Sequence, residues 1–75
     1  SDERMELVDF VVQPKAKIIG KAISHELPHD SMAGMVIREG EPMLPGGDFK
    51  AAVGDRIFVM SMPHVVSRVK KLFVS

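Results

Sequence analysis

Four side chains that can bind a metal stand close together between residues 25 and 30. They are His25, Glu26, His29 and Asp30. On a helix the two histidines would lie on one face, four residues apart, and zinc could bind them together with a carboxylate. Pro28 stands between the histidines and disfavours a continuous helix. We therefore expect an exposed loop here and no metal site.

The remaining nucleophiles and bases form no catalytic motif. The internal serines, Ser24, Ser31, Ser61 and Ser67, all lack the Gly-x-Ser-x-Gly context of a nucleophile elbow. His64 follows Pro63 at the expected start of a helix, where we expect an exposed side chain and not a general base. No two carboxylates are paired within an apolar segment, as acid–base catalysis would need. The sequence therefore predicts that the chain is not an enzyme.

The length and composition are those of one small domain. The 75 residues are 45% apolar, and a chain of this size buries only about 60% of the surface that its unfolded form exposes. The sequence has no cysteine, which excludes disulfides and thiolate metal sites as added support. Self-association as a dimer is the remaining way to bury more surface.

The first residues and the apolar runs indicate the domain organisation of the chain and its location in the cell. It begins Ser1-Asp2-Glu3-Arg4, without a methionine. We therefore expect a single domain over residues 1–75, with a flexible start over 1–4, cut from a longer protein. No apolar run approaches the roughly 20 residues that span a bilayer, and no signal peptide is present. A cytoplasmic setting fits the absence of cysteine.

The charges of the chain cancel. Ten basic and ten acidic residues give a net charge of zero. Phosphate binding needs a surplus of lysine and arginine, so we expect no nucleic acid among the partners. A polybasic membrane anchor is excluded for the same reason.

The hydrophobic pattern predicts four strands and two helices. In chain order they are a strand over 5–13, a short helix over 18–25, strands over 32–38, 41–44 and 56–62, and a helix from Pro63 to Phe73. The strand over 56–62 is apolar on both faces, which is typical of a central strand, whereas Pro42 restricts 41–44 to an edge. The order β-α-β-β-β-α predicts an α+β fold, with a small, mostly antiparallel sheet packed with two helices.

Glycines and aspartates mark the expected turns. The residues to which we assign turn formation are Gly20, Gly40, Asp48, Gly54 and Asp55. Glycine adopts the positive φ angles that tight turns need, and aspartate side chains accept hydrogen bonds from turn amides. Methionine is frequent in or beside the strands, at Met32, Met35, Met43, Met60 and Met62. Its flexible thioether suits both cores and adaptable binding surfaces, and the sequence leaves open which of these residues line a dimer interface.

The order and spacing of several motifs resemble the TrkA C-terminal (RCK-C) domain family. The motifs are Gly20-Lys21 before a short helix, Leu27-Pro28 after it, Arg38-Glu39-Gly40 closing a strand, Pro45-Gly46-Gly47-Asp48 in a loop, and Gly54-Asp55 before the last strand. The closing helix also ends like the family, in Lys71-Leu72-Phe73. The resemblance runs from about Met5 to Ser75.

This resemblance implies a regulatory role in potassium transport. Domains of the family follow a nucleotide-binding Rossmann domain, dimerise, and sit at the cytoplasmic face of a potassium channel, transporter or antiporter. The Gly-x-Gly-x-x-Gly fingerprint is absent from this chain, so we expect no cofactor in this fragment, with NAD or ATP bound by a separate N-terminal domain. The expected partners are a second copy, a membrane potassium transporter or channel, and a small-molecule effector. The expected location is cytoplasmic, peripheral to the inner face of the membrane.

Some members of the family resemble receptors for cyclic di-AMP, with a site between the first helix and the following strands of two subunits. On this chain the resemblance assigns ligand binding to Ile18, Ile19, His29 and Pro45. The members that bind this nucleotide carry an Arg and an Asn just after the short helix, whereas residues 26–31 contain neither. A dianion without a cation nearby is held poorly, so we expect weak binding at most.

Two other classes of function stay open at the level of sequence. The first is a generic small dimeric binding module, AbrB-like or another β fold, unrelated to ion transport. Its AbrB-like version predicts DNA binding, which zero net charge disfavours. The second is a small enzyme subunit, which the absence of a catalytic set disfavours. The residues before Ser1 in the full gene product would separate these hypotheses, because a Rossmann domain there supports a role in potassium transport.

Overall fold

The computed structural model describes residues 4–74, and in this part of the chain it has four strands and three short helical segments. In chain order these are β1 (Glu6–Val11), α1 (Ile23–Glu26), β2 (Ser31–Arg38), β3 (Glu41–Met43), β4 (Arg56–Ser61), the 3-10 helix η1 (Pro63–Val65) and α2 (Val66–Phe73). The predicted α+β fold is confirmed. Of the flexible start expected over residues 1–4, only Arg4 lies within the described residues.

The four strands form one antiparallel sheet in the order β1-β4-β2-β3. β4 lies between β1 and β2, so the strand predicted to be central is central. β3 lies at an edge, where the missing amide hydrogen of Pro42 does no harm. The register of β2 against β4 slips between Ala33 and Met35. The extra residue, Gly34, forms a β-bulge that increases the local twist.

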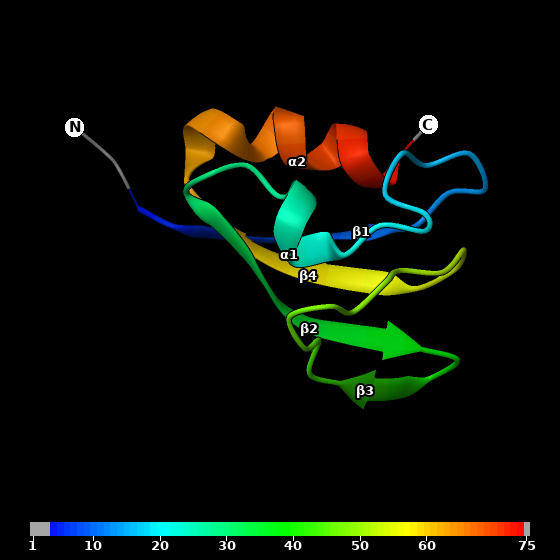
Figure 1. Ribbon diagram of the computed structural model, residues 1–75. Helices are drawn as coiled ribbons and strands as arrows, with labels where there is room; N and C mark the ends of the chain where they lie inside the picture. The colour runs from blue at the N-terminus through cyan, green and yellow to red at the C-terminus, as the bar shows by residue number, and fades with distance from the viewer. Residues whose placement is uncertain (1–3, 75) are drawn as a thin grey trace.

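The helix α2 covers one face of the sheet, which we call the inner face (Figure 1). Val65, Val69 and Phe73 are buried at the spacing of one helical face. The Phe73 ring stacks on Phe10 of β1, with ring centroids 5.9 Å apart. The core also contains Val12, Ala16, Ile18, Ile23, Val36, Ala51, Ile57 and Val59. The core therefore lies between the inner face, α2 and the loop that follows β1.

The first helix is shorter than the sequence predicts. The pattern over 18–25 predicts about two turns, whereas α1 has only the four residues Ile23–Glu26. Gly20 has a φ angle of 84°, a left-handed conformation that a right-handed helix does not contain. The helix therefore begins only after Gly20, and the extended Leu27 before Pro28 ends it. None of the helices within residues 4–74 is long and apolar enough to cross a membrane.

Glu39 and Gly40 form the two-residue turn between β2 and β3. Arg38 pairs with Glu41 across it, and φ is 50° for Glu39 and 81° for Gly40. Two successive positive φ angles are those of a type I′ turn, whose twist matches that of the flanking strands. Gly40 therefore has a left-handed backbone conformation, which residues with a Cβ atom adopt poorly.

Gly40→Ala is expected to lower the free energy of unfolding by about 1 kcal/mol, because an L-residue is strained in the left-handed region. Gly47→Ala is the matched control, since its Cβ would have no neighbour within 4 Å and its φ lies outside that region. It is expected to be neutral or slightly stabilising. Urea denaturation of the two variants measures the difference. Equal losses would contradict the turn assignment.

The opposite face of the sheet, which we call the outer face, carries mostly apolar side chains. It has three positions on each of β1, β4 and β2, aligned in cross-strand rows. Its apolar members are Leu7, Val11, Met32, Met35, Ile37, Phe58 and Met60, and its charged members are Asp9 and Arg56. Three strand methionines therefore lie on this face, whereas Met43 packs against the core.

Candidate functional site

A cleft of about 340 Å³ opens beside α1. Pro45 and Gly46, in the loop after β3, form one side, and α1 with the first residues of β2 forms the other. The lining is partly apolar, from Ile23, Leu27, Met32 and Ala33, and partly polar, from Ser24, His29, Asp30 and Ser31. Small-molecule sites of this size commonly combine an apolar floor with a few polar groups.

Hydrogen bonds hold the two sides of the cleft together. The Ser24 hydroxyl on α1 donates to the Gly47 carbonyl, which joins the helix to the loop after β3. The Met62 amide, just after β4, donates to the Asp30 carbonyl at 2.9 Å. The walls are therefore tied to the rest of the fold, and the cleft is formed before any ligand binds.

Asp30 is the acidic group of the cleft, and two histidines flank it. Its Oδ1 atom is 3.5 Å from Nε2 of His29, and its Oδ2 atom is 3.2 Å from Nε2 of His64. Asp30 has a φ angle of 72°, so the chain turns sharply there between α1 and β2. Among the described residues that line the cleft, none is a lysine or an arginine. With neutral histidines, the cleft therefore carries a single negative charge.

The structure brings together only some of the residues to which the resemblance assigns ligand binding. His29 and Pro45 line the cleft. Ile18 is fully buried in the core, and its amide donates to the Leu72 carbonyl at 3.0 Å. Ile19 is partly exposed and lies outside the lining. The sequence gives no local sign of the contact made by His64, because the chain returns to Asp30 only after β4.

The possible metal ligands between residues 25 and 30 do not converge. Because α1 ends at Glu26, His25 and His29 do not share a helical face. Within residues 4–74, no group of three or more His, Cys, Asp or Glu side chains is arranged so that it could hold a metal ion.

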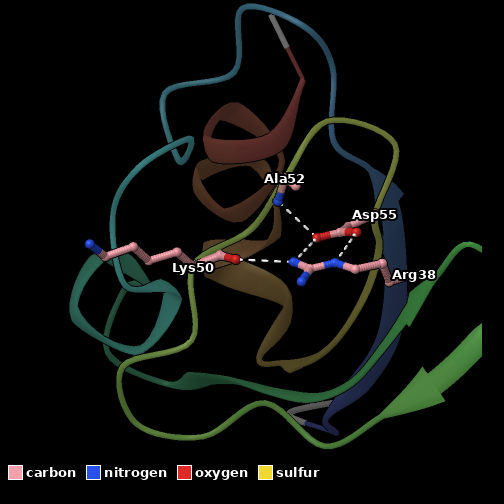
Figure 2. Close-up of polar contacts among 4 residues, drawn as sticks. All are labelled: Arg38, Lys50, Ala52 and Asp55. Carbon is pink, nitrogen blue, oxygen red and sulfur yellow. Dashed lines mark hydrogen bonds and ion pairs between the residues drawn. The ribbon is translucent and has the colours of Figure 1, made fainter.

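An ion pair joins β2 to the turn before β4 (Figure 2). Nε and Nη2 of Arg38 donate to the two carboxylate oxygens of Asp55 at 2.9 Å and 2.7 Å. The Ala52 amide donates to the same carboxylate at 2.8 Å. Nη2 of Arg38 also donates to the Lys50 carbonyl at 3.2 Å, and the guanidinium lies 4.9 Å from the centroid of the Phe49 ring. This network fixes the segment between the cleft loop and β4.

The network makes Asp55 a structural carboxylate. The hydrogen bond from Arg38 lowers the pKa of Asp55 below its ordinary value, burial opposes the shift, and the bond from the Ala52 amide adds to it. The same pairing raises the pKa of Arg38. Asp55 is only 2% exposed, so a ligand in solution does not contact it. We assign the pair to the fold and not to the cleft.

The other residues assigned to turns lie in loops. Gly20 and Gly54 have φ angles of 84° and 89°, and the Gly54 amide donates to the Val12 carbonyl at 2.9 Å. Asp48 is exposed in the loop after β3. Its carboxylate accepts no hydrogen bond from the part of the chain that the structure describes. Of the two aspartates assigned to turns, Asp55 is therefore the one whose carboxylate accepts a hydrogen bond from a turn amide, that of Ala52.

Comparison with known proteins identifies the family of this fold. The TrkA-C domain model matches residues 7–74. Over 72 residues the chain is 35% identical to the Trk system potassium uptake protein TrkA homolog 1 of Methanosarcina mazei. Over the same length it is 28% identical to a TrkA homolog of Archaeoglobus fulgidus. Each alignment covers 95% of this chain but only 16% of the relative. The family match replaces the AbrB-like alternative.

Two solved structures share the fold. The RCK_C domain dimer of S. agalactiae BusR in complex with c-di-AMP has a TM-score of 0.73 at 21% identity, covering 92% of this chain and 90% of that one. S. agalactiae BusR in complex with its busAB-promotor DNA has a TM-score of 0.72 at 22% identity, covering 89% and 35%. Because these sequence identities are low, the two structures show a shared fold and nothing further about this chain.

The prediction that nucleic acid is excluded from the partners is wrong. It rested on the zero net charge of the chain. The same fold occurs in BusR, which was solved with its promotor DNA, and in a domain solved with the nucleotide c-di-AMP. The net charge of one small domain does not describe the contacts of a longer protein, and a nucleotide is held by local groups in a pocket.

Proposed function

Because the chain belongs to the TrkA-C domain family of regulatory domains, we propose that it is the effector-sensing domain of a cytoplasmic potassium-uptake protein. On this proposal it binds a nucleotide-type effector in the cleft beside α1 and responds by a shift of population between two states, without catalysis. The observation that carries the proposal is the pre-formed cleft of about 340 Å³. The potassium-uptake relatives and the c-di-AMP bound to the BusR domain support it.

The lining of the cleft suits some parts of a nucleotide better than others. Its apolar floor offers surface to the face of a purine ring. The hydroxyls of Ser24 and Ser31 already donate to backbone carbonyls, so toward a ligand they act as acceptors, as the Asp30 carboxylate does. Acceptors bind the amino and hydroxyl groups of a nucleoside, whereas a carboxylate opposes a phosphate. We therefore expect Asp30 to set the affinity for phosphate-bearing effectors.

The proposal also includes self-association and a division of labour in the parent protein. Two copies of the domain associate, as the BusR domain does, and an effector that prefers one state of association shifts that equilibrium. Any NAD or ATP of the parent protein binds to a separate domain outside residues 1–75.

Asp30→Asn is expected to strengthen the binding of c-di-AMP about tenfold, because removing one opposing charge a few ångströms from a phosphate is worth about 1.4 kcal/mol. Asparagine is also among the residues that tolerate the left-handed backbone found at this position. Isothermal titration of the 75-residue chain and of the variant with c-di-AMP measures the two dissociation constants.

Glu39→Gln serves as the matched control for this experiment. It removes the same charge from the β2–β3 turn, and Glu39 does not line the cleft. Its dissociation constant is expected to equal that of the unsubstituted chain. The absence of binding heat from the chain and from Asp30→Asn alike would overturn the nucleotide-binding proposal.

A further inference from the structure

We propose that His64 controls the affinity of the cleft for phosphate-bearing ligands and makes that affinity depend on pH. The inference rests on the proposed function and concerns the regulation of the same site. His64 does not line the cleft, but its Nε2 atom lies 3.2 Å from Oδ2 of Asp30, which does. His64 therefore acts on a bound ligand through Asp30, whose negative charge it balances when it is protonated.

The fold brings three groups that ionise to one corner of the cleft. His29 and Asp30 lie in the turn between α1 and β2, and His64 lies in η1, soon after β4. The Met62 amide donates to the Asp30 carbonyl at 2.9 Å, which holds the start of η1 against that turn. Nε2 of His29 lies 3.5 Å from Oδ1 of Asp30. Each oxygen of the carboxylate therefore faces one imidazole.

The charge of this corner depends on the protonation of the two histidines. Histidine is the type of side chain whose charge ordinarily changes between pH 5 and 8. With both imidazoles neutral, Asp30 gives the corner a single negative charge, which opposes a phosphate. With both imidazoles protonated, the corner carries a single positive charge, which attracts one. The cleft is therefore expected to bind phosphate-bearing ligands more tightly as the pH falls.

The other charged groups near the cleft do not provide this switch. Within residues 4–74, Asp30 forms an ion pair with no charged side chain other than the two histidines. The surrounding elements also carry Glu26 on α1, Asp48 in the loop after β3, Glu6 on β1 and Arg68 on α2, all of them exposed. Carboxylates and guanidinium groups ordinarily keep their charge between pH 5 and 8. A change of affinity within this range therefore reports on histidine.

Solvent screening limits the size of the effect. The side chains of His29, His64 and Asp30 are 97%, 62% and 41% exposed. A unit charge about 6 Å from a phosphate in water changes the affinity about threefold. Protonation of both histidines is therefore expected to change it about tenfold at low ionic strength. The phosphodiester groups of c-di-AMP keep their charges over this range, so the ligand itself adds no pH dependence.

Isothermal titration of the chain with c-di-AMP at about pH 8 and about pH 5.5, at one low ionic strength, tests the proposal. The dissociation constant is expected to be about tenfold lower at the lower pH. His64→Gln keeps a group that can donate to Asp30 but cannot take up the proton. It is expected to reduce the difference to about threefold. Replacing both His29 and His64 by glutamine is expected to abolish it.

Proton uptake provides a second measurement that a purely structural role of His64 would not change. A ligand that binds the protonated histidines more tightly also favours their protonation, because the coupling is reciprocal. The complex is therefore expected to take up protons when it forms. Titrations at about pH 6.5 in buffers of different ionisation enthalpy measure this uptake. It is expected to fall in His64→Gln.

His25→Gln is the matched control, because His25 is exposed on α1 and lies outside the lining of the cleft. It is expected to keep the tenfold difference, and circular dichroism at both pH values checks the fold of every variant. Equal dissociation constants at the two pH values, or a difference that persists in the double variant, would overturn the inference. The absence of binding heat at both pH values would instead overturn the nucleotide-binding proposal on which it rests.

Discussion

Asp55→Ala is expected to lower the free energy of unfolding by about 3 kcal/mol. The substitution leaves the Arg38 guanidinium without its carboxylate and leaves the Ala52 amide without its acceptor. Removing one partner of a buried pair costs about 3–5 kcal/mol. The Arg38 side chain keeps 34% of its exposure, so water solvates it in part and the loss lies at the low end of that range.

A loss of this size matters because the whole fold is marginal. For 75 residues a total stability of about 4–11 kcal/mol is usual. Urea denaturation followed by circular dichroism measures the change. Asp9→Ala is the matched control, since it removes a carboxylate from an arginine pair that is exposed on the outer face. It is expected to cost less than about 1 kcal/mol. Similar losses for the two variants would contradict a structural role for the Asp55 network.

The same network predicts how stability depends on pH. The pKa of Asp55 is lowered in the folded chain, so the folded state binds its proton less readily than the unfolded state. Its contribution is fully present above the unfolded value of about 3.9 and is lost as the pH falls through the lower folded value. Asp55→Asn is expected to remove this acid-dependent part of the unfolding free energy, which a urea titration at several pH values measures.

The sheet could be predicted from the sequence because its signals are local. Glu39-Gly40 between two apolar runs predicts a hairpin, and the structure has a type I′ turn there. The two apolar faces of residues 56–62 predict a central strand, and β4 occupies that place. Each of these signals depends on a few neighbouring residues, and the resulting fold satisfies all of them together.

The cleft could not be predicted in the same way, because its parts come from distant segments. His64 contacts Asp30 only after the chain has crossed the sheet in β4. The Arg38–Asp55 pair likewise joins β2 to the turn before β4, and no local pattern indicates that Arg38 is the partner of Asp55. The first helix was predicted too long because its apolar spacing continues through Gly20, whose φ of 84° ends any helix there. Spacing alone cannot detect that backbone angle.

Ile18 is the residue for which the role expected from the sequence and the position found in the structure differ most. The resemblance assigns Ile18 and Ile19 to ligand binding together. In the structure Ile18 is fully buried, whereas Ile19 is 37% exposed. The two neighbours have the same side chain, so a comparison of their alanine variants separates a core role from a ligand-binding role.

Ile18→Ala is expected to lower the free energy of unfolding by about 3 kcal/mol, because it removes buried methyl groups and leaves a cavity in the core. For a domain of this size the loss corresponds to a fall in Tm of about 12 °C or more. Ile19→Ala removes the same atoms from a partly exposed position and is expected to cost less than about 1 kcal/mol. Thermal unfolding followed by circular dichroism measures both changes. If the two variants unfold at the same temperature and Ile18→Ala instead weakens c-di-AMP binding, Ile18 belongs to the ligand site and the core described above is wrong at that position.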